Sequence, residues 1–325
     1  MELAQTVVPR IVRKRTLSPL VRCTFAELDQ RLKNDYNSCG AMVPYTPLKP
    51  CASCGQRQVQ AIVSSPPPGA EIIEGNAALI DEDTGEVSAL QVIAVPDLAN
   101  RLSVGFGRMK WNSDNLHKTS GGESRLSGMV VTHRTFGYTP PVPLRRRWAC
   151  ASSRFDIEEP EMSSKILEYI VAAEHVFRTQ AGDKYEQTAA AVLEKIPAAW
   201  RIAGSPWTSG IINNTAALPY HRDSNNIKGS WSAMLAIRNN VDGGLLHLAD
   251  YDVWLRVPNG SISIFDGQSV LHGVSPFKLS GPNAYRYTIV SYARRGLRVC
   301  CPDPKGESKR AAIAATVADD KRRIK

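Results

Sequence analysis

Three residues in the C-terminal half of the chain have the types and the order of a metal-ligand set. His221 and Asp223 are two positions apart, so on an extended strand both side chains would point to the same face. His272 comes much later, from a segment that also has strand character. Two imidazoles and one carboxylate that leave coordination positions open are the ligands of non-haem Fe(II) oxygenases. The sequence therefore predicts an iron centre, with these three side chains as metal ligands and catalytic residues.

A second set of side chains has the chemistry to hold a dicarboxylate. Arg286 and Thr288 share one face of an expected strand at 285–292. A guanidinium group binds a carboxylate through two parallel hydrogen bonds, and a neighbouring hydroxyl adds a third donor. The pair could therefore hold the distal carboxylate of 2-oxoglutarate. Asn213, on an earlier strand, is a further candidate ligand of a cosubstrate or a base, or it only satisfies backbone groups.

The elements expected around these residues are short strands preceded by two helices. Helical periodicity predicts helices over 163–180 and 184–196. Alternation and turn signals predict strands at 210–216, 219–222, 232–237, 244–248, 253–257, 261–264, 269–274 and 285–292. Many short strands at close spacing are typical of a sandwich or a barrel. The expected fold is therefore α+β, with a double-stranded β-helix (jelly roll, cupin-like) core backed by supporting helices.

The N-terminal part carries fewer signals. We expect strands at 102–109 and 128–138, and two weaker strands within 71–95 around a turn. Between them, Trp111 next to Lys110 either stacks on a flipped or single-stranded base or is a partly buried structural residue. The expected organisation is an N-terminal extension of unknown role (1–95), the jelly-roll domain (96–300) and a basic tail (301–325).

Charge and hydropathy restrict the partners and the location. Lys and Arg outnumber Asp and Glu by 40 to 31, which gives a net charge of +9 and favours a nucleic acid as partner. The basic clusters, one of them at 145–147, either contact phosphates or form solvated loops and ends. No apolar run is long enough to cross a membrane, and no secretory signal is apparent. We expect an intracellular protein, nuclear in a eukaryote and cytoplasmic in a prokaryote or virus.

Cysteine usage gives two further expectations. Seven cysteines, an odd number, argue against a disulfide framework in an intracellular protein. Cys51 and Cys54 have the spacing of metal ligands, and Cys23 and Cys39 could complete a structural zinc site with them. The alternative is that these are buried or free thiols.

The residues around both candidate ligand sets also resemble a known family. The run from His221 through Asp223 to Asn226, His-Arg-Asp-Ser-Asn-Asn, resembles the HRDxxN motif of the ten-eleven translocation (TET) enzymes. The strand at 285–292, from Arg286 onward, resembles their R-x-S-L-V-F-Y strand, and Ser209-Gly210 also agrees. The chain is therefore similar to Fe(II)/2-oxoglutarate-dependent dioxygenases, in the TET/JBP branch that holds methylcytosine dioxygenases and base-J thymidine hydroxylases. The resemblance covers about 128–295.

The resemblance implies a reaction and its participants. It implies Fe(II), 2-oxoglutarate and O₂, and hydroxylation of the 5-methyl group of a flipped pyrimidine in DNA, with 5-methylcytosine favoured over thymine. It assigns Asn226, Arg222, Tyr292 and Arg294 to the substrate side, although Arg294 stands where TET enzymes carry His. An Asn amide both donates and accepts, so Asn226 does not by itself decide between cytosine and thymine.

Other functions remain open at this stage. One is an AlkB-like nucleic-acid demethylase or a protein hydroxylase of the same fold. AlkB enzymes carry a second Arg where this chain has Tyr292, which argues against them. A different class is a non-catalytic nucleic-acid-binding protein. The sequence predicts no oligomeric state.

Overall fold

Alternating side chains along the central strand divide the interior into two apolar layers. In β8 (Ser232–Asn239), Leu235 and Ile237 face one cluster, whereas Met234 and Ala236 face another. Successive side chains of a strand point to opposite faces, so β8 is buried on both sides. The computed structural model describes residues 10–14, 63–81, 84–111, 132–141, 150–215 and 217–300.

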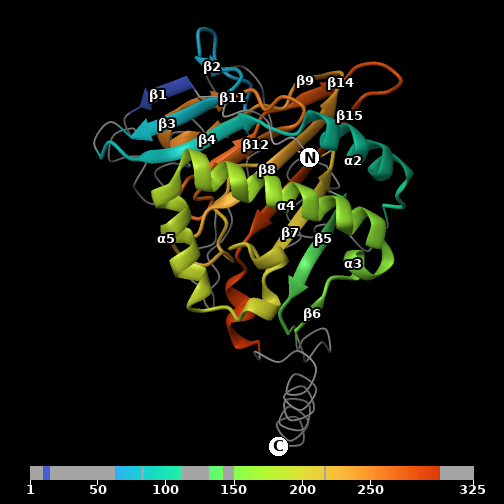
Figure 1. Ribbon diagram of the computed structural model, residues 1–325. Helices are drawn as coiled ribbons and strands as arrows, with labels where there is room; N and C mark the ends of the chain where they lie inside the picture. The colour runs from blue at the N-terminus through green and yellow to red at the C-terminus, as the bar shows by residue number, and fades with distance from the viewer. Residues whose placement is uncertain are drawn as a thin grey trace, which may run out of the picture.

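The strands form two facing sheets and a hairpin (Figure 1). The large sheet has the order β1-β3-β4-β12-β8-β15-β7-β5-β6, the small sheet β13-β10-β11-β2, and the hairpin pairs β14 with β9. The other strands of the large sheet are β1 (Arg10–Lys14), β3 (Ala77–Asp81), β4 (Val87–Ile93), β5 (Thr132–Thr139), β6 (Ala151–Ser152), β7 (Ser209–Asn214), β12 (Ser261–Phe265) and β15 (Tyr285–Tyr292). The remaining strands are β2 (Ile72–Ile73), β9 (Val241–Gly243), β10 (Leu246–Leu248), β11 (Val253–Leu255), β13 (His272–Val274) and β14 (Phe277–Leu279).

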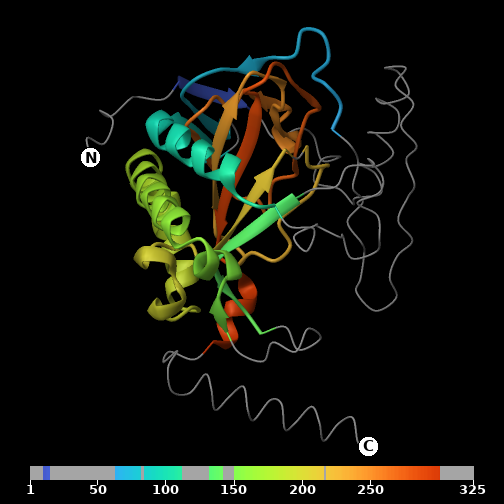
Figure 2. The same ribbon diagram turned by 90° about the vertical axis from the view of Figure 1, so that its right-hand side faces the viewer.

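The helices cover one face of the large sheet, and the small sheet faces the other. They are α2 (Pro96–Arg108), α3 (Arg154–Glu158), α4 (Pro160–Gln180) and α5 (Gly182–Leu193). Short 3₁₀ turns lie at η5 (Ala198–Trp200), η6 (Ile202–Gly204), η7 (Ala249–Tyr251) and η8 (Arg295–Val299). Figure 2 shows α2, α4 and α5 together on one side of the sheet. The fold is α+β, with a double-stranded β-helix core backed by helices.

A single hydroxyl ties the longest helix to the centre of the sheet. Tyr169 of α4 is fully buried and donates to the carbonyl of Ala233 in β8 over 2.7 Å. It accepts a hydrogen bond from Ser291 of β15 over 3.1 Å. Burial raises the pKa of the Tyr169 hydroxyl, which stays protonated and able to donate.

Two expected elements differ from the structure. The helices over 163–180 and 184–196 are confirmed as α4 and α5, but the strand predicted over 102–109 is wrong, because residues 102–108 belong to α2. Leu98, Leu102 and Phe106 recur every four positions and form the buried face of that helix. The predicted strand at 219–222 is also wrong: only His221 pairs there, in an isolated bridge.

The sheets extend into the segment before residue 96. The expected jelly-roll domain begins at residue 96, but β3 and β4 precede that residue. In the large sheet, β3 pairs with β4 and β4 pairs with β12. β2 pairs with β11 in the small sheet. Residues from 72 onward are therefore part of the same two sheets as the candidate ligands.

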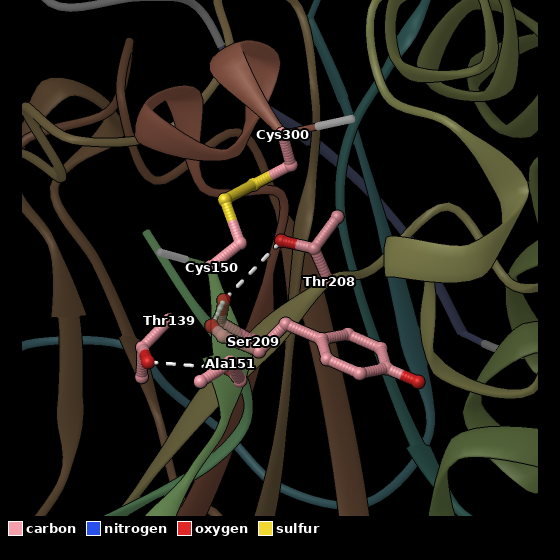
Figure 3. Close-up of a disulfide and its surroundings, with 7 residues drawn as sticks. Thr139, Cys150, Ala151, Thr208, Ser209 and Cys300 are labelled. Atoms are coloured by element: carbon pink, nitrogen blue, oxygen red, sulfur yellow. Dashed lines mark hydrogen bonds between the residues drawn. A yellow bond between two sulfur atoms is a disulfide. The ribbon is translucent and has the colours of Figure 1, made fainter. Parts of the chain in front are cut away.

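A disulfide corrects the expectation drawn from the cysteine count. Cys150 and Cys300 are bonded, with their Cα atoms 5.9 Å apart (Figure 3). The bond joins the residue before β6 to the residue after η8, and Thr139 of β5 donates to the carbonyl of Ala151 beside it. An odd count carries no information on which cysteines the fold brings together, and these two are 150 positions apart.

Several expectations concern residues outside the described ranges. They are the zinc site at Cys23, Cys39, Cys51 and Cys54, the basic cluster at 145–147 and the tail at 301–325. Among the helices that are described, none has both the length and the apolar character needed to cross a membrane.

Candidate metal centre

The two candidate histidine ligands are held side by side by their own backbones. The His221 N–H donates to the carbonyl of His272 over 2.9 Å, and the His272 N–H donates back over 3.1 Å. This two-residue antiparallel bridge joins the loop before β8 to β13. With Asp223, the two histidines form a group whose ligand atoms all lie within 4.8 Å of one another. The structure therefore brings together the three side chains predicted from the sequence.

Both imidazole rings are fixed in the orientation that a metal needs. Nδ1 of His221 lies 2.8 Å from the carbonyl of Pro219, and Nδ1 of His272 lies 2.9 Å from the carbonyl of Val270. A carbonyl can only accept, so Nδ1 carries a proton in each ring, and Nε2 is the nitrogen that can offer a lone pair to a metal. This arrangement of a metal-ligating histidine is common, because the second hydrogen bond sets both the tautomer and the ring plane.

Asp223 is positioned with one oxygen toward the histidines and the other held by neighbours. Its Oδ1 lies 3.7 Å from Nε2 of His221. Its Oδ2 accepts from the Asn226 amide over 3.2 Å and from the Ser232 hydroxyl over 3.4 Å. A β-carbon added at Gly267 would lie 2.4 Å from Oδ2, so this position requires glycine for close packing. Oδ1 is thus the oxygen that can bind a metal.

The electrostatics keep His272 neutral. Burial, and secondarily the neighbouring His221, lower the pKa of the His272 imidazole from 6.5 to about 4, and Asp223 opposes this shift. A neutral imidazole has the lone pair that a metal requires. Two imidazole nitrogens and one carboxylate oxygen fit a divalent iron ion.

A carboxylate behind the centre joins the residues next to both histidines. Asp250 of η7 accepts from the Arg222 guanidinium at 3.0 and 3.1 Å. Its Oδ2 also accepts from the backbone N–H of Leu271 over 2.8 Å. Arg222 follows the first ligand and Leu271 precedes the last, so Asp250 stabilises the bridge from behind. The substrate contact expected of Arg222 stays a prediction.

The residues expected to hold 2-oxoglutarate lie together on β15 and β7, which are neighbours in the large sheet. Arg286 and Thr288 share one face of β15, and Asn213 of β7 is opposite Thr288 in register. The Asn213 amide donates to the Thr288 hydroxyl over 3.2 Å, and all three side chains are buried. The Arg286 guanidinium lies over the ring of Phe277, 5.0 Å from its centroid.

The electrostatics of Arg286 suit an anionic partner. Burial, and secondarily the neighbouring Arg238, lower the pKa of the Arg286 guanidinium to about 9. A carboxylate bound here would offset both effects, since it would favour the charged form. The site therefore fits a dicarboxylate cosubstrate.

The remaining predicted residues lie at different depths. Tyr292 ends β15, and burial raises the pKa of its hydroxyl; Arg294 opposes this shift and Asp223 adds to it. Arg294 forms a backbone bridge with Asn226, which is buried. Their substrate contacts stay predictions. Trp111 is structural, because its indole stacks on Tyr287 on the helix side of the sheet.

Some residues that shape the site carried no sequence signal that we recognised. Asp250 lies in no motif, and Phe277 belongs to a strand, β14, that was not expected. Gly267 lies in a turn before β13 and is not among the residues predicted to shape the site. Its close approach to Asp223 depends on the fold, which brings the two together through a hydrogen bond from the Asp223 N–H to the Gly267 carbonyl over 2.8 Å.

The jelly roll and its His-Asp-His ligand set are the features of Fe(II)/2-oxoglutarate-dependent dioxygenases, and the chain is an enzyme of this class. Residues 143–295 match the family Tet_JBP, described as the oxygenase domain of the 2OGFeDO superfamily. This segment, a little under half of the chain, is thus similar to the TET/JBP oxygenases, whose superfamily name denotes Fe(II) and 2-oxoglutarate.

Comparison with other known proteins gave weaker similarities. One solved structure is described as NgTET1 in complex with 5mC DNA; it has a TM-score of 0.48 and 16% identity and covers 76% of this chain and 91% of that one. Another is an oxidoreductase of the 2OG-Fe(II) oxygenase family from Burkholderia pseudomallei, with a TM-score of 0.39, 11% identity and coverage of 64% and 88%. No curated protein matches the chain.

Proposed function

We propose that this dioxygenase hydroxylates the 5-methyl group of a pyrimidine in DNA and prefers 5-methylcytosine to thymine. The observation that carries the proposal is a hydrogen bond between the Asn226 amide and Asp223, which is one of the three candidate metal ligands. The HRDxxN motif and the match of residues 143–295 to the Tet_JBP family support DNA as substrate. The net charge of +9 is independent support, because it favours a polyanion.

The residues have separate roles in this proposal. His221, Asp223 and His272 hold Fe(II), which together with 2-oxoglutarate and O₂ supplies the oxidant for a C–H bond. Arg286 and Thr288 hold the far carboxylate of 2-oxoglutarate and fix its orientation. A base in a duplex must leave the stack before its methyl group can reach such a centre.

The hydrogen bonds of Asn226 support cytosine over thymine. A carboxylate only accepts, so the contact with Asp223 Oδ2 must be made by the Asn226 NH₂ group. The same NH₂ group donates to the Ser232 hydroxyl over 3.0 Å. Both amide hydrogens are then used, and the Oδ1 acceptor is left for a further partner. Cytosine presents an N4 amine donor, whereas thymine presents an O4 acceptor.

The experiment compares two duplexes of identical sequence that differ only in whether one cytosine is methylated. Each is incubated with the protein, Fe(II) and 2-oxoglutarate, and the nucleosides are then measured by mass spectrometry. We expect hydroxymethylcytosine from the methylated duplex and no hydroxymethyluracil from either. The Asp223→Ala variant should form neither product.

Three outcomes would contradict the proposal. Hydroxymethyluracil without hydroxymethylcytosine would reverse the base preference. Consumption of 2-oxoglutarate with no modified nucleoside in either duplex would exclude both bases as substrates. Full turnover by Asp223→Ala would exclude the metal assignment.

A further inference from the structure

A basic hollow lies beside the metal centre, and its charged residues have no role in the chemistry described so far. It has a volume of about 230 Å³. Four of its lining residues are cationic and none is acidic: Lys195, Lys228, Arg295 and Arg298. The hollow also contains Asn226 and Gln268.

Three separate segments of the chain bring these charges together. Lys195 follows α5, Lys228 lies in the loop after the HRDxxN motif, and Arg295 and Arg298 belong to η8, which follows β15. A backbone hydrogen bond from the Arg295 N–H to the Asn225 carbonyl, 2.9 Å long, holds η8 against that loop. The assembly of the cluster thus depends on the fold and not on a local run of basic residues.

The four cations have no acidic partners within the part of the chain that the structure describes. None of them forms an ion pair there, whereas other cations do, such as Arg134 with Glu158 and Arg256 with Glu74. Lys228, Arg295 and Arg298 are exposed, and Lys195 is half-buried. Like charges that converge on one hollow repel one another, and a bound anion would relieve this repulsion.

One residue that lines the hollow, Asn226, is hydrogen-bonded to the candidate metal ligand Asp223. The Gln268 amide donates to the Asn226 carbonyl over 3.1 Å, and the Asn226 amide contacts Asp223. Gln268 also directly follows Gly267, which packs on Asp223. An anion in the hollow would therefore lie beside residues that contact the metal ligand Asp223.

We propose that this hollow binds backbone phosphates of the nucleic-acid strand that presents the target base. The inference rests on the proposed function, because it identifies where the strand next to that base is held. Lys228, Arg295 and Arg298 are the phosphate-contacting residues, and Lys195 adds to the field. Phosphate contacts position a strand without reading its sequence, so the hollow contributes affinity to methylated and unmethylated DNA alike.

The experiment measures DNA binding without catalysis. Metal-free protein is titrated with a fluorescent unmethylated duplex at several salt concentrations, and anisotropy gives the dissociation constant. The Lys228→Ala/Arg298→Ala variant should bind roughly tenfold more weakly near 0.15 M salt. Its slope of log affinity against log salt should fall by about one for each cation removed. Lys228→Arg should bind like the wild type.

The matched control removes two cations elsewhere. Arg108→Ala/Lys278→Ala changes the net charge equally, at exposed positions in α2 and in β14, away from η8 (Figure 1). It should leave the salt slope close to the wild-type value. An equal loss in both double variants would overturn the proposal, since general charge would then explain the binding. Thermal melting confirms that each variant is folded.

Two further results separate this proposal from its neighbours. Inorganic phosphate at millimolar concentration could raise the melting temperature of the protein while the double variant keeps its affinity for DNA. In that case the hollow is a site for free anions, and the proposal is overturned. If the hollow variant loses DNA binding but the wild type hydroxylates neither base, the proposed function fails and the phosphate site stands.

Discussion

The two carboxylate oxygens of Asp223 have different neighbours. Oδ1 is directed toward His221, whereas Oδ2 is held by Asn226 and Ser232. The absence of a side chain at Gly267 makes this orientation possible, because a β-carbon there would overlap Oδ2. The geometry of this ligand thus depends on a residue that contacts no metal.

Substitution of Gly267 should weaken metal binding without unfolding the protein. We expect Gly267→Ala to lower the affinity for Fe(II), or for Co(II) as a stable substitute, by roughly 10- to 100-fold, as is typical when a ligand loses its support. Anaerobic calorimetric titration measures this affinity. The control is Gly107→Ala, where an added β-carbon meets no atom within 4 Å. Equal affinities in the two variants would contradict the prediction.

The depressed pKa of the His272 imidazole makes the metal-free protein sensitive to acid. In the unfolded chain the pKa is near 6.5, and in the folded protein it is about 4. The unfolded state therefore binds more protons between these values, and stability falls as the pH falls from about 6.5 to about 4. Above about 6.5 this contribution is fully present.

Thermal melting of metal-free protein across this pH range tests that dependence. His272→Gln should flatten the curve, because the buried titrating group is removed. His175→Gln, at an exposed position of α4, should leave it unchanged. A wild-type curve that is level from pH 7 to about 4 would contradict the assigned shift.

At the scale of elements, α4 is fixed to the sheet by a buried hydroxyl. The Tyr169→Phe variant leaves the Ala233 carbonyl and the Ser291 hydroxyl without this partner. We expect the free energy of unfolding to fall by about 1–2 kcal/mol, measured by denaturant titration. Tyr285→Phe is the control, because its hydroxyl makes no hydrogen bond to any described residue, and it should change stability by less than about 0.5 kcal/mol.

Elements with strong periodicity could be predicted from the sequence. The strand over 285–292 and the helix over 163–180 agree with β15 and α4 because each repeats its apolar residues at the period of its structure. The strand predicted over 102–109 is wrong because Val104 and Phe106 favour strands locally, whereas Leu98, Leu102 and Phe106 form the buried face of a helix. The strand preference of single residues conflicts there with the helical period of the apolar residues, and packing of the apolar face against the sheet stabilises the helix.

The candidate site was predictable only in part. Its ligands belong to short motifs, so His221, Asp223 and His272 could be identified from order and type. The contacts of Asp250, and the charges gathered in the basic hollow, come from segments far apart in the chain. Their proximity depends on strand order in two sheets, which no local pattern encodes.

At the scale of the whole molecule, one covalent bond joins two distant parts of the sheet domain. The disulfide between Cys150 and Cys300 closes a loop with a sequence separation of 150. Removing it with Cys150→Ser should lower the free energy of unfolding by about 2–4 kcal/mol, because the unfolded chain becomes less restricted. Denaturant titration measures the difference. A reductant should destabilise the wild type and have no effect on the variant.

The mutual backbone hydrogen bonds of His221 and His272 have a consequence for how the protein responds to its metal. The two ligands come from opposite ends of a chain segment that includes the central strand β8, and they meet only when both sheets have formed. An unfolded chain offers no comparable chelate, so a bound ion stabilises only the native state. The metal ion is then bound only while the protein is folded. Removal of the ion by a chelator should therefore lower the melting temperature of the protein. On heating, the ion should be released in the same cooperative transition in which the two sheets unfold.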